Sequence, residues 1–578
     1  MNSAVHFIFD SEHINSIESR LYGFCATKDG LFTGAIPSED LSNATGAWVL
    51  VKRTREGIVI TQDPIGCFGL FLFRDRNYWA LSNSFNHLLD YLKLAHKLTF
   101  NKEYADSLLA QQLCVSVYGE TIIREIQWLD RRSKIHIDFA SGELTIHYCH
   151  LDENTIPVET SEGMRILDSW HDKWASYVQK AGQSWPGNIM VDLSGGFDSR
   201  MVLAPILSSG IKVWQVKYNS LPNLHEDFRI ASMIAEEFGF PLNQKKDCSM
   251  FERLSTIGSF SERLLENIFF EKEIYLFDPA QLFVPNIVFS GFGGELTRGY
   301  WEELNCQNLM KKLIKAGNNM TESVESIERV RQGAETIMLR SFQGIDNMLK
   351  ETDSGYIKGT LNGCQYYRET RNRSHYGMSV ARLFLHQIYR HTPLLDPLLL
   401  KLRKPLNGKH TMLICAIILT RYHEKLVSFP FEGGRSIPEE TILYARELNR
   451  RFPRETNHLS TTDNDTEDAT WQPIRIMAED VAVETDHRNS EQQPITKKIQ
   501  MNEKLVRAFN SATVQRHIKE LYGECFSNWL DPNLDKRHPN AAKYAVVAIS
   551  KALEDVTKGK NAHKDFSTFI EACLSETI

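Results

Sequence analysis

The spacing of hydrophobic positions divides the chain into a first part with strand-like patterns and a second part in which strands and helices alternate. In the first part, short β-branched and aromatic runs are separated by polar turns, which is typical of strands. These runs lie at 49–51, 58–60, 71–73 and 135–137. A helical stretch, Ala105 to Cys114, interrupts them. We therefore expect a mostly β domain over residues 1–155.

From about residue 160 the pattern predicts alternating helices and strands. Helices are expected at 164–181, 201–208 and 227–238, and short apolar strands at 189–193, 213–216 and 284–289. This alternation predicts a parallel sheet with right-handed crossovers, in a domain spanning residues 160–450. Residues 455–495 are polar and acidic and are expected to form a flexible insert. Residues 500–578 return to a helical pattern.

Composition narrows the class of protein. The chain has 578 residues and a net charge of −7, so it is long enough for several domains and lacks the basic charge typical of nucleic-acid binding. Its ten cysteines include no CxxC pair, which argues against a zinc site or a disulfide framework. The N-terminus has no signal-peptide pattern, and the longest apolar run, 413–419, is too short for a membrane span. We therefore expect a cytoplasmic protein without membrane partners.

The strand at 189–193 leads directly into the segment Ser194 to Ser199, which reads SGGFDS. At the carboxyl end of a parallel strand, such a loop lets backbone N–H groups and hydroxyls face an anion. Gly195 and Gly196 allow close approach of the backbone to phosphate oxygens. Asp198 is compatible with phosphate only if a divalent cation lies between them. The segment therefore predicts a phosphate and a divalent cation as ligands. It resembles the signature of the ATP pyrophosphatases, which implies ATP and Mg²⁺.

Three later segments resemble the C-terminal domain of the asparagine synthetases over about residues 160–450. They are Trp214 to Asp227, Ser290 to Tyr300, and Thr392 to Asp396. The resemblance implies an adenine-nucleotide α-hydrolase-like (HUP) parallel sheet with a helical extension. It also implies site roles. Adenine and ribose would contact Leu193, Val216 and Gly291; phosphates would contact Ser194, Gly195, Gly196, Ser199 and Ser290; Mg²⁺ would be shared by Asp198 and Glu295.

The second loop departs from this family. Phe292 and Gly294 stand where asparagine synthetases carry acids, and the ungapped loop is closer to the β-lactam synthetases, which place a Tyr where Phe292 stands. The Lys expected after the third segment is missing. Arg435 is the nearest cation, so Arg435 and Glu295 are the catalytic candidates, although a surface arginine is an equal alternative for Arg435.

Three arginines upstream, Arg368, Arg371 and Arg373, admit two interpretations. They form either a clamp for a substrate carboxylate or a solvated helix face.

Residues 42–150 resemble the glutaminase half of the same family, which implies an Ntn-hydrolase-like β-sandwich. Asp63 to Gly66 and the strand after it carry this likeness. That glutaminase needs a cysteine at position 2, where this chain has Asn2, and Cys25 and Cys67 are internal. We therefore expect no glutamine hydrolysis, and a structural or homodimer-forming role for this domain.

Together these features predict an ATP-dependent ligase that forms AMP and pyrophosphate. It would adenylate a small-molecule or peptide carboxylate, and ammonia or a substrate amine would then form an amide. Two alternatives stay open: an asparagine synthase that uses ammonia, and a nucleotide-binding pseudoenzyme that acts as a scaffold.

Overall fold

The computed structural model describes most of the chain up to residue 454 and short pieces beyond it. The described residues are 6–27, 30–38, 41–93, 95–111, 116–151, 153–184, 187–212, 215–221, 224–242, 286–298, 305–314, 324–353, 356–384, 388–405, 410–454, 509–522, 546–547, 549–550 and 552–556. The insert predicted at 455–495 lies outside them, as does most of the helical part predicted at 500–578.

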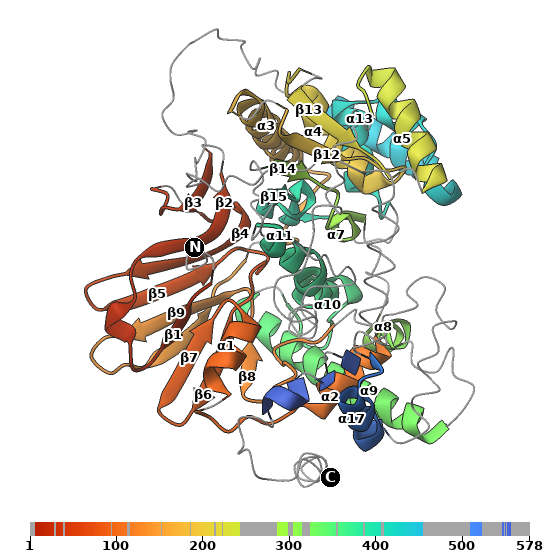
Figure 1. Cartoon of the computed structure of the whole chain (residues 1–578). Coiled ribbons are helices and arrows are strands. Elements are labelled where there is room, and N and C mark those ends of the chain that lie inside the picture. Colours follow the sequence, from red (N-terminus) through yellow and green to blue (C-terminus); the bar gives the residue numbers. More distant parts are fainter. Residues whose placement is uncertain are drawn as a thin grey trace, which may run out of the picture.

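The N-terminal part consists of two antiparallel sheets (Figure 1). One sheet has the order β1-β7-β6-β8 and the other β10-β9-β5-β4-β2-β3. The strands are β1 Ile8–Asp10, β2 Arg20–Ala26, β3 Leu31–Gly34, β4 Thr45–Arg53, β5 Gly57–Gln62, β6 Phe71–Asp75, β7 Tyr78–Ser82, β8 Ile126–Trp128, β9 Ser133–Asp138 and β10 Leu144–Tyr148. The four predicted strand runs are confirmed. The predicted helix corresponds to α2, Lys102–Ala110, and α1 spans Phe85–Leu92.

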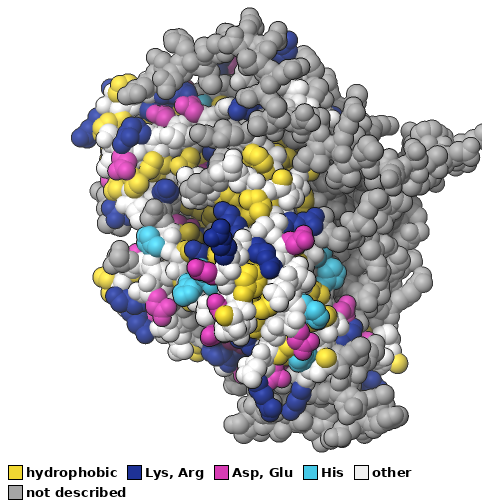
Figure 2. Space-filling view, turned by 90° about the vertical axis from the view of Figure 1, so that its left-hand side faces the viewer, with side chains coloured by type: hydrophobic (Ala, Val, Ile, Leu, Met, Phe, Trp, Pro, Cys, Tyr) yellow, Lys and Arg dark blue, Asp and Glu magenta, His cyan; other side chains and the backbone are white. Residues whose placement is uncertain are grey.

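Buried and partly exposed side chains alternate along the strands, and the buried ones of both sheets belong to one hydrophobic core. In β9, Ile135 and Ile137 are buried, whereas Lys134 and His136 are partly exposed between them. One face of the strand therefore packs inward and the other points outward, as expected for an antiparallel sheet with one covered face. Figure 2 views the molecule from the left-hand side of Figure 1, and charged and histidine side chains lie among hydrophobic ones on this face.

The second part contains a four-stranded parallel sheet, so the structure is a mixed α/β fold. Its order is β13-β12-β14-β15. The strands are β12 Ile189–Asp192, β13 Val216–Asn219, β14 Asn286–Phe289 and β15 Ile388–His391. The strand predicted at 213–216 is placed too early, and residues 213–214 lie outside the described chain. In β13 the buried Val216 and Tyr218 alternate with the exposed Lys217. The strand is therefore marked by this alternation of buried and exposed positions, and not by the apolar run at 213–216 on which the prediction was based.

The strand order reverses beside β12, and we call the space at the carboxyl ends of β12 and β14 the crevice. From β12 the chain passes to β13 on one side, and it returns as β14 on the other side of β12. Connections that diverge from neighbouring strands leave an opening at their carboxyl ends, which is where ligands bind in open α/β sheets. The loops after β12 and β14 therefore meet at this opening.

Helices surround the parallel sheet (Figure 1). The predicted helices are confirmed as α3 Ser161–Ser184, α4 Phe197–Ser208 and α5 His225–Phe238. Helix α13, Leu413–Tyr422, contains the longest apolar run, and Leu413 to Leu419 are all buried, so this run forms a core helix. Among the described residues, the search for a helix of membrane-spanning length and apolarity finds none.

The remaining elements continue the helical character predicted after residue 300. They are α7 Gly294–Arg298, α8 Cys306–Leu313, α9 Val324–Thr352, α10 Gly363–Glu369, η4 Arg373–Gly377, α11 Met378–Phe384, η5 Pro393–Leu395, α12 Pro397–Leu400, α14 Lys425–Ser428, η6 Glu432–Gly434, α15 Glu439–Arg451 and α17 Ala512–Tyr522. A short parallel pair, β11 Ile156–Pro157 and β16 Leu402–Arg403, joins the segment between the two parts to the second one.

A buried network of ion pairs holds the two parts together. Arg131, which follows β8, contacts Glu369 of α10 at 2.8 Å and Glu153 of the connecting segment at 2.6 Å. Arg132 also reaches Glu369 at 2.8 Å, and Arg368 reaches Glu153 at 2.8 Å. The interpretation of the later arginines as a solvated helix face is therefore wrong for Arg368, which is buried against Glu153.

Arg373 is buried as well. Its guanidinium donates to the Leu129 carbonyl at 2.7 Å and lies 4.4 Å from the centre of the Trp128 ring. Of the predicted trio, Arg368 clamps a carboxylate of the protein itself and Arg373 anchors η4 to the N-terminal part.

Replacing Glu369 by Gln is expected to destabilise the protein by about 3–5 kcal/mol, because removal of one partner leaves buried arginine charges uncompensated. Urea unfolding measures the loss. The matched control is Glu328→Gln, whose partner Arg331 is exposed, and its effect should stay within about 0.5 kcal/mol. Equal losses in the two variants would contradict a structural role for this network.

Candidate functional site

The loop after β12 is folded by hydrogen bonds among its own hydroxyls. The Ser194 N–H donates to Ser199 Oγ at 3.1 Å, and the Gly196 N–H donates to Ser194 Oγ at 3.1 Å. Ser199 Oγ also donates to the Ser194 carbonyl at 3.2 Å. Gly196 is the N-cap of α4, and no side chain of this residue caps the first N–H groups of the helix. Two of the three serines predicted to contact phosphate, Ser194 and Ser199, therefore lie together at the start of this helix.

Gly195 has a different role from the predicted one. Its N–H donates to Asp227 Oδ1 at 2.6 Å, so in this structure Asp227 of α5 uses that donor. A Cβ here would lie 2.9 Å from Ile230 Cδ1 and 3.0 Å from Asp227 Oδ1. A side chain at position 195 would therefore force the side chains of α5 that pack against the loop to shift.

The loop after β14 packs directly on Asp198. A Cβ on Gly291 would lie 2.9 Å from Asp198 Cβ, and one on Gly294 would lie 2.1 Å from Asp198 Cγ. A residue with a side chain at position 294 would displace the carboxylate. The position of Gly294 therefore has no room for the acid that the predicted resemblance would place there.

Asp198 has one satisfied and one unsatisfied carboxylate oxygen. Oδ2 accepts from Arg298 Nη2 at 2.8 Å, whereas Oδ1 is buried with no hydrogen-bond partner among the residues that the structure describes. Burial raises the pKa of Asp198 to about 6; Arg298 opposes the rise and the charge of Glu295 adds to it. The nearby negative charge shows that the two predicted metal ligands lie within electrostatic reach of each other.

Glu295, at the start of α7, is held by a tyrosine from η4. Its Oε1 accepts from the Tyr376 hydroxyl at 2.7 Å. Burial, Tyr367 and Glu295 raise the pKa of Tyr376 far above its usual range, so the phenol keeps its proton. The Tyr376 and Phe292 rings lie 4.5 Å apart. A tyrosine hydroxyl thus stands beside Phe292, although it comes from a distant segment.

Arg435 lies beside the crevice but is exposed. It pairs with Glu432 at 2.5 Å, and its guanidinium lies 5.5 Å from the centre of the Phe197 ring. Its charge opposes the burial-driven rise in the pKa of Asp198. Arg435 is therefore a surface arginine whose charge reaches Asp198, and its catalytic role stays a prediction.

The segment that carries Arg435 closes over the first loop. The Glu432 N–H donates to the Gly195 carbonyl at 3.1 Å, and the Gly433 N–H donates to Glu226 Oε2 at 3.1 Å. The Phe431 and Phe197 rings stack with centres 4.1 Å apart.

The sequence interpretation missed Arg200, Arg298 and Tyr376. Arg200 is buried and donates to carbonyls of Gly195 at 3.1 Å and Phe429 at 3.0 Å, which ties the loop to the covering segment. Arg200 directly follows SGGFDS, and Arg298 lies one turn after Glu295, so their positions were a usable signal. Tyr376 gave none, because its contact with Glu295 spans 81 residues.

The other predicted nucleotide contacts divide between the crevice and the opposite end of the sheet. Leu193 is buried, and its N–H donates to the Asn219 carbonyl at 2.8 Å. Ser290 Oγ is buried without a hydrogen-bond partner among the described residues. Val216, however, pairs with Ile189 at the amino-terminal end of these strands. The structure therefore does not bring Val216 to the two loops.

The donor set fits Mg²⁺ only together with phosphate. The described residues contain no group of three or more His, Cys, Asp or Glu side chains that could hold a metal ion. Mg²⁺ is often bound by one or two carboxylates and completed by water and phosphate oxygens. Asp198, with its orphaned Oδ1, and Glu295 would be those carboxylates.

In the N-terminal part, Asn2 lies outside the described residues. Cys25 and Cys67 are both buried. Burial and the neighbouring Asp63 raise the pKa of the Cys67 thiol well above its usual range. Asp63 accepts from the Cys67 N–H at 2.9 Å, so the DPIG segment forms a tight turn. A buried, protonated thiol of this kind is a poor nucleophile.

No protein-family model matches the chain, and no curated protein sequence matches it either. The likeness to asparagine synthetases therefore stays a prediction.

Gly294→Ala is expected to weaken binding of Mg²⁺–ATP about tenfold or more, because a Cβ 2.1 Å from Asp198 Cγ must displace the carboxylate. Titration with a fluorescent ATP analogue measures the change. Ser169→Ala, at an exposed position of α3, is the control. The site geometry is contradicted if both variants bind like the unmodified protein.

Binding of Mg²⁺–ATP should weaken as the pH falls through about 6, since protonation of Asp198 removes its charge. The loss should approach about tenfold per pH unit. The same titration from pH 5 to pH 8 measures it. Asp198→Asn reports the titration of the nucleotide alone, so parallel profiles for the two proteins would exclude Asp198 as the titrating group.

Proposed function

We propose that this protein is an ATP-dependent ligase of the asparagine synthetase type, which adenylates a carboxylate and releases pyrophosphate. In this proposal the second part is a HUP-like nucleotide domain, and the N-terminal part is an Ntn-like domain without glutaminase activity. Ammonia or an amine of the substrate then forms the amide.

The observation that supports the proposal most is the meeting of two loops at the carboxyl ends of β12 and β14. The Asp198 carboxylate, with one unpartnered oxygen, lies between Gly294 and Arg298 at this point. A buried carboxylate with a pKa near 6 is costly to the fold, and such groups cluster at functional sites. Binding of a cation beside phosphates would compensate that cost.

The chain's residues suit defined roles in this reaction. Ser194, Ser199 and Ser290 would donate to phosphate oxygens. Arg298, together with the more exposed Arg435, would stabilise charge that develops as the bond between the α and β phosphates breaks. Mg²⁺, when bound by Asp198 and Glu295, would neutralise the triphosphate. Tyr376 would orient Glu295 by donating to Oε1.

One observation favours a second candidate, a nucleotide-binding pseudoenzyme. Arg298 already pairs with Asp198 Oδ2, so a protein cation stands close to where the metal ion would be needed. If this pair does not open, the protein would bind nucleotide without adenylating a substrate.

Exchange of labelled pyrophosphate into ATP, with a panel of carboxylates, distinguishes the candidates. The ligase proposal expects exchange that depends on a carboxylate and falls at least about a hundredfold in Asp198→Asn. The control is Asp90→Asn, an exposed acid paired with Lys93, which should retain full exchange. Nucleotide binding without exchange would favour the pseudoenzyme. Asparagine formed from aspartate and ammonium would identify an asparagine synthase.

A further inference from the structure

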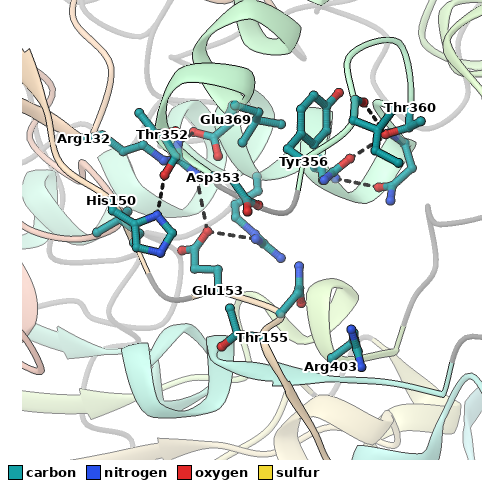
Figure 3. Close-up of a pocket in the computed structure, with 17 residues that line it drawn as sticks. Arg132, His150, Glu153, Thr155, Thr352, Asp353, Tyr356, Thr360, Glu369 and Arg403 are labelled. Atoms are coloured by element: carbon teal, nitrogen blue, oxygen red, sulfur yellow. Dashed lines mark hydrogen bonds and ion pairs between the residues drawn. The ribbon is translucent and has the colours of Figure 1, made fainter.

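A pocket of about 520 Å³ lies at the junction of the two parts, away from the loops of the candidate ligase site. The end of α9, the start of α10, the connecting segment and β16 form its walls (Figure 3). Its volume is in the usual range for small-molecule sites.

The acids on one wall are already neutralised. Glu153 pairs with Arg131 and Arg368, and Glu369 pairs with Arg131 and Arg132. This part of the lining therefore presents satisfied ion pairs and contributes little net charge to a ligand.

Another part of the lining presents hydrogen-bond donors. Asn362 and Gln365 form a capping box, in which Asn362 Oδ1 accepts from the Gln365 N–H at 2.9 Å and Gln365 Oε1 accepts from the Asn362 N–H at 3.0 Å. Both amide oxygens are used, so their NH₂ groups remain as donors. Arg403 of β16 adds a guanidinium, and among the described residues no carboxylate lies within ion-pair distance of it. Such a set suits a carboxylate.

The lining also includes an acid. Asp353, just after α9, and Arg403 both line the pocket (Figure 3). A carboxylate oxygen can accept several hydrogen bonds, so Asp353 can receive an ammonium group while it keeps its present contacts.

We propose that this pocket binds a free amino acid or an amino-acid-like zwitterion. The ligand carboxylate pairs with Arg403 and receives hydrogen bonds from Asn362 and Gln365. The ligand ammonium group donates to Asp353. Because the walls come from the connecting segment, α10 and β16, the ligand also stabilises the junction between the two parts.

Calorimetric titration of the full chain with each of the twenty common amino acids tests the proposal. At least one should bind saturably with one ligand per chain. Arg403→Gln should weaken that binding about tenfold or more, and Asp353→Asn should weaken it similarly. Arg403→Lys keeps the positive charge but not the two parallel N–H donors of the guanidinium, so it should weaken binding less than Arg403→Gln does. Arg446→Gln is the control, since Arg446 is exposed and pairs with Glu424.

Two further comparisons separate this pocket from the ligase site and test the dipolar character of the ligand. Asp198→Asn should retain the binding, whereas its loss in that variant would place the amino acid at the ligase site and overturn the proposal. Succinate, which lacks the ammonium group, should bind at least about tenfold more weakly than the bound amino acid. No saturable binding by any amino acid, or unchanged binding in Arg403→Gln, would also overturn it.

Discussion

The close packing of Asp198 against Gly291 and Gly294 is the contact on which the candidate site depends. It joins the loop after β12 to the loop after β14, and it is possible only because neither glycine carries a Cβ. The contact buries the carboxylate, which raises its pKa, and Arg298 supplies the partial compensation. In the proposed function, a metal ion would compensate the burial of this carboxylate more fully than a single arginine does.

The junction between the two parts affects this site through a continuous segment. Glu369 at the end of α10 is fixed by Arg131 and Arg132, and the chain continues into η4, where Arg373 is anchored to Trp128 and Leu129. The same short helix carries Tyr376, which holds Glu295. The N-terminal part thus supports an element of the candidate site.

The sequence predicted those features that depend on local pattern. Apolar runs identified the strands, and the strand–loop–helix setting of SGGFDS was predicted correctly, because the segment lies between β12 and α4. It failed where a contact joins distant segments. Tyr376 was missed because no residue near Glu295 in the sequence indicates the contact between them. The burial of Arg368 was missed because a polar run on a helix does not show which of its side chains meet a buried partner. The resemblance assigned Val216 to the nucleotide, whereas its pairing with Ile189 places it at the amino-terminal end of the strands, away from the two loops.

The most direct test of the account is the coupling between Asp198 and Glu295 in binding Mg²⁺–ATP. A double-mutant cycle with Asp198→Asn and Glu295→Gln, read by nucleotide titration at several Mg²⁺ concentrations, measures it. If one ion contacts both carboxylates, the double variant should bind only slightly more weakly than either single variant, with a coupling of about 1–3 kcal/mol that depends on Mg²⁺. Additive losses that do not change with Mg²⁺ would contradict a shared metal site.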